Sequence, residues 1–207
     1  METRDVCVFV FDTLADWEVG HAIAHINSPE YQKQPGRYRV RSVGLTRSAI
    51  TTTGGLRIVP DITLDEIEPT RCAMLILPGG SAWDRGEAGA AVDKAMQLQA
   101  AGVPVAAICG ATGALARAGA LDQRAHTSNA LQYLEPQPGY SGAAQYRQEP
   151  AVTDKGIITA GATAPVAFAR EIFRALDLYS ERVLNAWYGL FATGEARYYF
   201  ELVQAAG

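Results

Sequence analysis

The feature that most constrains the fold of this chain is the junction between an apolar run at residues 103–108 and a helical pattern that begins at Gly110. The apolar run predicts a buried strand, and the pattern after it predicts a helix. The small residues Ala107 and Ala111 lie two positions before and after Cys109, so strand and helix can approach closely at a sharp turn. The junction therefore predicts a nucleophile elbow with Cys109 at its apex.

Short apolar runs alternate with helical patterns along most of the 207 residues. This alternation predicts an α/β fold whose mainly parallel sheet is covered by helices on both faces. A Thr- and Gly-rich piece at 51–59 predicts a hairpin, whereas the polar segment 135–150 shows no periodicity and predicts a loop. The expected strands are 6–11, 38–45, 72–77, 103–108, 124–128 and 156–159, and the expected helices begin at Asp16 or span 88–101, 110–118 and 165–176.

The chain length and its 48% hydrophobic residues suit a single domain over residues 1–207. Within that domain, residues 179–207 are expected to form a C-terminal helical extension packed on the rest. The extension is rich in aromatic residues, which leaves three interpretations open: further core packing, a dimer contact, or a cover over the functional site. The aromatic residues are Trp187, Tyr188, Phe191, Tyr198, Tyr199 and Phe200.

The formal net charge of -4 argues against a nucleic-acid partner, since phosphate binding depends on clustered Lys and Arg. No apolar stretch reaches the ~20 residues of a membrane helix, and the N-terminal residues show no signal-peptide pattern. We therefore expect a cytoplasmic protein with no membrane partner. Its three cysteines are then expected to be free thiols. Cys7 and Cys72 lie in apolar strands, which predicts buried, unreactive thiols.

Cys109 differs from these two because it directly precedes a helix. The positive end of the helix dipole lowers a thiol pKa and favours the thiolate, so we expect Cys109 to be reactive. Gly79 and Gly80 follow the strand at 72–77 and can offer N–H groups to an oxyanion, although an ordinary tight loop explains the pair equally well. Both features fall at carboxyl ends of expected strands, where open parallel sheets bind their ligands.

Glu18 follows the first strand and opens the first helix, so it too is expected at this edge of the sheet. One interpretation is a carboxylate that only complements the helix dipole. Another is a metal site, since Glu18, His21 and His25 share one helical face. Histidines on a packing or surface face are commonplace, so we expect no metal and no cofactor.

Four segments carry a further signal: DWEV after the first strand, LPGGSAWD, AAICGATGALARAGALDQRAHTSN and ITAGATAPVAFAREIF. Together they resemble the ThiJ/PfpI superfamily, which is related in fold to the class I glutamine amidotransferases. The resemblance covers the chain to about residue 176. It implies a flavodoxin-like three-layer sandwich, usually dimeric, with the elbow cysteine as the functional centre.

The resemblance also implies that Glu18 lies beside the sulfur of Cys109 and that Gly79 and Gly80 supply oxyanion N–H groups. Such a pairing favours a thiolate only if the carboxyl is protonated, because a charged carboxylate opposes the negative sulfur. The candidate catalytic residues are therefore Cys109, Glu18, Gly79, Gly80 and Gly110.

The chain departs from the superfamily pattern in places that bear on activity. Protease-like members carry His directly after the cysteine, where this chain has Gly110. Other members present a His or Tyr after the next strand, where this chain has Asn129, and His126 is expected to face away from it. Residues 159–165 lack the His and Glu of amidotransferases. These departures disfavour peptidase and glutamine amidotransferase activity.

The remaining pattern favours a small-molecule enzyme with Cys109 as nucleophile and Glu18 as proton relay. Glyoxal-type carbonyls or glycated adducts suit a glyoxalase-like or deglycase-like enzyme, and isocyanides suit a hydratase-like one. The alternative is a redox-responsive or binding protein in which Cys109 oxidises to a sulfinic acid held by nearby N–H groups. The expected partners are a small-molecule substrate and a second copy of the chain, as a homodimer.

Overall fold

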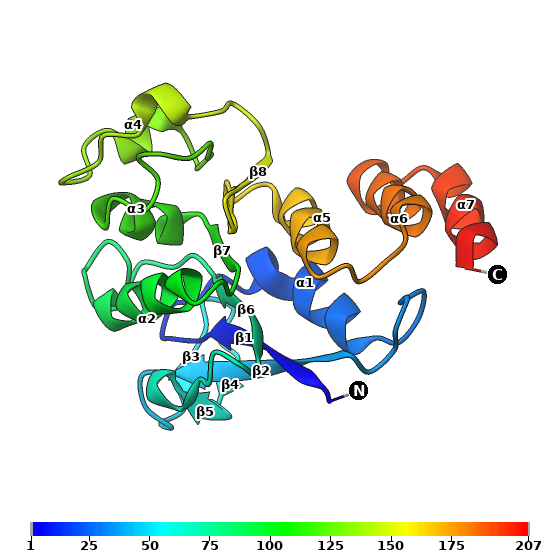
Figure 1. Ribbon diagram of the computed structural model, residues 1–207, viewed down its shortest axis with the longest axis horizontal. Helices are drawn as coiled ribbons and strands as arrows, with labels where there is room; N and C mark the ends of the chain where they lie inside the picture. Colours follow the sequence, from blue (N-terminus) through cyan, green and yellow to red (C-terminus); the bar gives the residue numbers. More distant parts are fainter. Residues whose placement is uncertain (1, 207) are drawn as a thin grey trace.

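The computed structural model describes residues 2–206, in which strands and helices alternate (Figure 1). The strands are β1 (Arg4–Phe9), β2 (Tyr38–Gly44), β3 (Ile50–Thr51), β4 (Arg57–Ile58), β5 (Ile62–Thr63), β6 (Cys72–Leu77), β7 (Val105–Ile108), β8 (Ala151–Asp154) and β9 (Ile157–Ala160). The α-helices are α1 (Asp16–Asn27), α2 (Gly89–Ala100), α3 (Gly110–Arg117), α4 (Leu131–Leu134), α5 (Pro165–Ala175), α6 (Glu181–Thr193) and α7 (Ala196–Ala206). Short 3₁₀ helices are η1 (Leu64–Glu66) and η2 (Ala143–Gln145).

Within the described residues, seven strands form one sheet in the order β5-β2-β1-β6-β7-β9-β8. Neighbouring strands are parallel except β8 and β9, which form an antiparallel pair at one edge. The middle strands β6 and β7 are buried along their whole length, as strands covered on both faces must be. Helix α1 packs with α5 and α2 packs with α3, which places helical layers on the two faces of the sheet (Figure 1). The predicted flavodoxin-like three-layer α/β sandwich is confirmed.

Parts of the sheet differ from the sequence prediction. The strand expected at 124–128 is reduced to a single bridge between His126 and Tyr146. Strands β5 and β8 are additional: β5 has two residues, too few for a periodic pattern, and β8 is an edge strand with polar side chains. The hairpin expected at 51–59 is present as the antiparallel pair of β3 and β4.

The C-terminal extension consists of two helices, α6 and α7. Ser180 begins α6 by accepting a hydrogen bond from the Val183 N–H, and Gly194 ends it in the left-handed conformation. Trp187 of α6 is fully buried against Phe173 of α5 (ring centroids 4.9 Å apart), so this part of the extension is core packing. The aromatic side chains of α7 are mostly exposed. Throughout residues 2–206, the helices are all too short or too polar to span a membrane.

Candidate active site

Cys109 occupies a strained turn between β7 and α3. Its φ of 58° and ψ of -125° lie outside the regions that non-glycine residues ordinarily adopt. The turn is held by three hydrogen bonds: the Cys109 N–H donates to the Ala160 carbonyl at 3.0 Å, and the Thr112 N–H and Oγ1 donate to the Cys109 carbonyl at 3.0 and 2.6 Å. The predicted elbow geometry is therefore present, with a partly exposed sulfur at its apex.

Asn129 is the side chain that donates a hydrogen bond to this sulfur. Its Nδ2 lies 3.5 Å from Cys109 Sγ, and its Oδ1 accepts a hydrogen bond of 2.9 Å from the Ala162 N–H. The preceding residue, Ser128, is buried and shares a hydrogen bond of 2.6 Å with Thr112 of α3. These bonds fix the orientation of the amide, so that its N–H points at the sulfur.

Glu18 comes from the first turn of α1 and is fully buried. Its Oε2 accepts a hydrogen bond of 2.5 Å from the Gly79 N–H, whereas Oε1 has no hydrogen-bond partner in residues 2–206. Gly79 lies between the carboxyl and the cysteine: a Cβ added there would lie 2.5 Å from Glu18 Oε2 and 2.6 Å from Cys109 Cβ. Glycine at this position therefore lets Glu18 and Cys109 approach each other.

Burial is the main influence on the pKa of both groups. It raises the pKa of Glu18, and the Gly79 N–H partly opposes that change. Burial also raises the pKa of the Cys109 thiol; the Asn129 amide and Gly110 N–H lower it, and the Glu18 carboxyl raises it. The pKa lowering expected from the helix N-terminus is thus outweighed. A proton on Glu18 removes the charge that opposes the thiolate.

The glycine pair after β6 is used differently from the sequence expectation. The Gly79 N–H is occupied by Glu18, so it is not free to bind an oxyanion. The Gly80 N–H has no protein acceptor within residues 2–206. Gly80 has a φ of 157°, and a Cβ there would lie 2.5 Å from the Thr13 carbonyl oxygen, so its backbone position requires glycine. Gly80 and Gly110 remain as backbone donors for the site.

No histidine takes part in this arrangement within the described chain. His126 is fully buried, where Nδ1 lies 2.8 Å from the Arg124 carbonyl and Nε2 lies 2.8 Å from the Tyr140 hydroxyl. It therefore faces away from Asn129, as strand alternation predicts. Cys109 consequently lacks an imidazole base.

The alternative metal site on α1 is not formed. His25 accepts a hydrogen bond of 3.2 Å from Trp187 Nε1, and His21 packs edge-on against Phe191 with the ring centroids 5.1 Å apart. Glu18 is instead bonded to Gly79. No group of three or more metal-ligating side chains is found among residues 2–206.

Two features beside the elbow were absent from the sequence prediction of the site. A cavity of about 260 Å³ borders Asn129, and polar residues such as Ser128, Gln148 and Thr163 line it. Trp17 is 54% exposed and donates a hydrogen bond of 3.3 Å to the carbonyl of Ala162, the residue whose N–H holds Asn129. Its signal in the sequence is its position directly before Glu18.

These features define a class: an α/β protein with a thiol at a nucleophile elbow, a buried carboxyl beside it and no histidine base. A sequence profile of the DJ-1/PfpI family matches residues 4–175. The chain belongs to this family, which confirms the resemblance seen in its four sequence segments.

The chain is 42% identical over 205 residues to the Uncharacterized protease YoaZ of Bacillus subtilis (strain 168), with 98% of each chain covered. A crystal structure of a thiJ/pfpI family protein from Bacillus anthracis is similar with a TM-score of 0.91 and 41% identity, covering 100% of this chain and 98% of that one. The Deglycase PfpI of Pyrococcus furiosus is 33% identical over 101 residues, which span 48% of this chain and 61% of that protein.

Proposed function

We propose that this protein is a cysteine-dependent enzyme that acts on small reactive carbonyl compounds, of the glyoxal or glycated-adduct kind. One observation carries the proposal: Cys109 Sγ accepts a hydrogen bond from Asn129, while the buried Glu18 carboxyl lies across Gly79 with one oxygen unpartnered. A buried oxygen without a partner is costly unless it is protonated and can donate. The sulfur is the acceptor that a proton on Glu18 Oε1 would find.

The proposed reaction begins when Cys109 Sγ attacks the carbonyl carbon of the substrate. A C–S bond forms as the thiol proton passes to Glu18, the electron pair of the C=O π bond moves to oxygen, and the proton that Glu18 already held neutralises that oxygen to give a hemithioacetal. The Gly80 and Gly110 N–H groups are the donors available to stabilise the developing negative charge. A cavity borders Asn129, the residue that is bonded to the sulfur, although Cys109 itself does not line it.

The same site disfavours peptide hydrolysis. Expelling an amine from a tetrahedral intermediate needs a proton donor of imidazole type beside the nucleophile, and His126 is held away by Arg124 and Tyr140. The relative named as a protease is described as uncharacterized, and the more distant relative is named as a deglycase. The second name agrees with carbonyl chemistry at the elbow.

The direct test is turnover of methylglyoxal by the wild type and by the variants Cys109→Ala and Glu18→Gln. Because both groups act in the same step, we expect each variant to lose at least about a hundredfold in kcat/KM. Glu181→Gln, in an exposed residue of α6, is the matched control for Glu18→Gln and should keep full activity. Turnover that is unchanged in Cys109→Ala and Glu18→Gln would end the proposal.

A second candidate, a redox-responsive protein, is favoured by the donors around the sulfur. Oxidation of Cys109 by peroxide to a sulfinic acid adds two oxygens, and the donors available to bind them are the Asn129 amide, which already donates to the sulfur, and the Gly80 N–H. Mass spectrometry of peptides after mild peroxide treatment tests this function. Oxidation of Cys7 or Cys72 in preference to Cys109 would count against it.

We further propose that the chain is a cytoplasmic homodimer that uses no cofactor and binds neither nucleic acid nor membranes. The net charge of -4 and the exposed apolar side chains of Tyr199, Phe200 and Val203 on α7 support these assignments. Light scattering of the purified protein at micromolar concentration should give twice the mass of one chain. A monomer at that concentration would contradict the dimer.

A further inference from the structure

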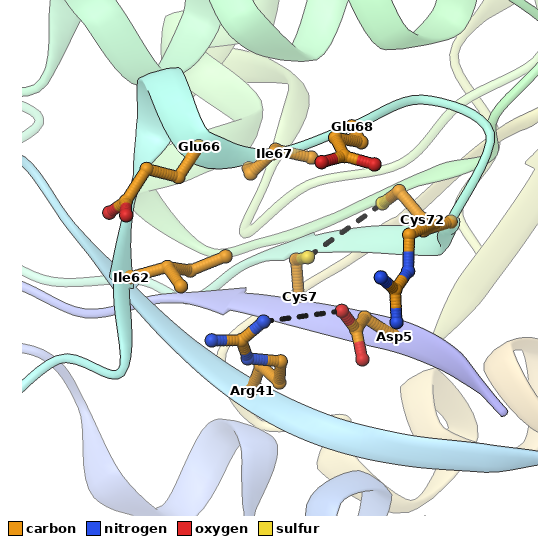
Figure 2. Close-up of a pocket in the computed structure, with 9 residues that line it drawn as sticks. Asp5, Cys7, Arg41, Ile62, Glu66, Ile67, Glu68 and Cys72 are labelled. Carbon is orange, nitrogen blue, oxygen red and sulfur yellow. Dashed lines mark hydrogen bonds and ion pairs between the residues drawn. The ribbon is translucent and has the colours of Figure 1, made fainter.

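A second pair of thiols lies away from Cys109, toward the amino ends of the parallel strands. Cys72 is the first residue of β6, whereas Cys109 follows the last residue of the parallel strand β7. Figure 2 shows Cys72 and Cys7 of β1 pointing toward one another at the floor of a cavity. The cavity has a volume of about 50 Å³ and is lined by Asp5, Cys7, Arg41, Ile62, Glu66, Ile67, Glu68, Arg71 and Cys72.

The two sulfurs are close, but the backbones that carry them are not. Cys7 Sγ and Cys72 Sγ are 3.8 Å apart. In the strand register, Cys72 is paired with Asp5, two residues before Cys7. Regular strands ~4.8 Å apart with a rise of ~3.3 Å per residue place such diagonal Cα atoms about 8 Å apart, and here the register of β1 and β6 also shifts between Asp5 and Val6.

This register prevents a disulfide without movement of the strands. A disulfide requires Cα atoms roughly 4.4–6.8 Å apart, and a pair beyond ~7 Å cannot be bridged unless the backbone moves. Both strands lie in the interior of the sheet, where β1 is bonded to β2 as well as to β6. Cys7 and Cys72 therefore form a dithiol that is held open.

An ion placed between the sulfurs meets no such obstacle. Two sulfurs on opposite sides of one ion at ~2.3 Å each lie about 4.6 Å apart. The sulfurs are 3.8 Å apart, so an ion held by this pair alone requires them to separate by roughly 0.8 Å, which rotation of the two side chains can supply with the strands in place. A cavity of about 50 Å³ has room for one ion or water molecule beside them, but not for an organic ligand.

The donor set selects the kind of ion. Zinc sites use three or four protein ligands, and no group of three metal-ligating side chains occurs in residues 2–206. Thiolates select soft ions such as monovalent copper. Asp5, Glu66 and Glu68 line the cavity together with two arginines, but Asp5 is paired with Arg39 and Arg41 and Glu66 with Arg47, so the two sulfurs and not the surrounding charge select the ion.

We propose that Cys7 and Cys72 form a buried dithiol site for monovalent copper, separate from Cys109. When it binds, both thiols lose their protons to solvent and two copper–sulfur bonds form, with no change in oxidation state. Neither Cys7 nor Cys72 takes part in the proposed carbonyl chemistry. The copper site can therefore be confirmed or refuted separately from the proposed enzymatic function.

The test is an anaerobic titration of the purified protein with copper(I) held in excess bicinchoninate, whose absorbance reports the copper that the protein removes. We expect one copper per chain in the wild type and in Cys109→Ala. Cys7→Ala and Cys72→Ala should each lower the affinity by at least about a hundredfold, since the pair can no longer bind together. Loss of copper in Cys109→Ala, or full retention in Cys7→Ala and Cys72→Ala, would overturn the proposal.

Two further measurements keep the result decisive if a variant folds poorly. X-ray absorption of the copper-loaded wild type should show two sulfur ligands, and a spectrum with one sulfur or none would overturn the assignment. Peroxide treatment of folded Cys109→Ala should leave Cys7 and Cys72 unlinked. A disulfide between them, detected by mass spectrometry, would refute the open geometry on which the site depends.

Discussion

The cysteines toward the two ends of the parallel strands have different surroundings. At the carboxyl ends, Cys109 lies at positive φ on a turn, partly exposed, with an amide donor and a buried carboxyl beside it. Toward the amino ends of the strands, Cys72 begins β6 and Cys7 lies within β1, beside a shift in the register of the two strands. Each is 1% exposed, and the two sulfurs are neighbours. The backbone conformation, more than the identity of the residue, decides which thiol is exposed to solvent.

The comparison also explains why the pKa alone does not rank the thiols. Burial raises the pKa of Cys109, whereas the hydrogen bond with Cys7 lowers the pKa of Cys72. A more acidic thiol that an alkylating reagent reaches only when the sheet opens nevertheless reacts slowly with it. Access and the placement of neighbouring donors therefore set the reactivity in this protein.

The largest difference should appear in alkylation of the native protein by iodoacetamide. Because Cys7 and Cys72 become accessible only when the sheet opens, we expect Cys109 to react at least about a thousandfold faster than either. Peptide mass spectrometry over a time course measures all three rates in one sample. Equal alkylation rates for Cys109 and Cys72 would contradict the difference in accessibility between the two thiols.

The close approach of Glu18 and Cys109 can be disrupted by a substitution at Gly79. An alanine there places its Cβ against Glu18 Oε2 and Cys109 Cβ, so Gly79→Ala must push the carboxyl and the thiol apart. We expect turnover to fall about a hundredfold, the cost of a misplacement of ~1 Å in a catalytic pair. Gly89→Ala is the control, because nothing lies within 4 Å of the added Cβ. Full activity in Gly79→Ala would show that the pair does not depend on its spacing.

The proton on Glu18 can be tested through the pH profile of Cys109 alkylation. Glu18→Leu removes the donor and leaves the thiolate buried, so the thiol pKa should rise and the rate near neutral pH should fall about tenfold. Glu18→Gln keeps a neutral donor and should change the rate little. If Glu18 is instead charged and repels the thiolate, both variants will alkylate faster than the wild type, which would contradict the proposed proton relay.

The raised pKa of Glu18 also makes the free energy of unfolding depend on pH. Burial raises the pKa of Glu18 in the folded protein. The folded state therefore holds the proton more tightly than the unfolded chain, and stability falls as the pH rises from about 4.3 toward the folded pKa. Urea unfolding of the wild type and Glu18→Gln across this range should show a decline that the variant lacks.

The elbow was predictable from the sequence because strand, nucleophile and helix are contiguous in it. Glu18 was found through its place after the first strand and through the resemblance. The roles of Gly79 and Asn129 were not predictable, because each depends on the approach of distant segments and on one side-chain orientation. The proximity of Cys7 and Cys72 depends on β1 lying beside β6. The hydrophobic periodicity of a segment predicts a strand but not its neighbours in the sheet, so this proximity could not be predicted.

The smallest expected difference concerns the free energy of unfolding. Cys72→Ala removes a fully buried side chain from a central strand, which should lower it by about 1–2 kcal/mol. Cys109→Ala removes a partly exposed side chain and keeps the strained backbone, so we expect a change within about 0.5 kcal/mol. Urea denaturation of both variants at one pH measures the contrast. A larger loss in Cys109→Ala would mean that the thiol holds the elbow together, whereas its hydrogen bonds point to Thr112 and the backbone as the groups that do so.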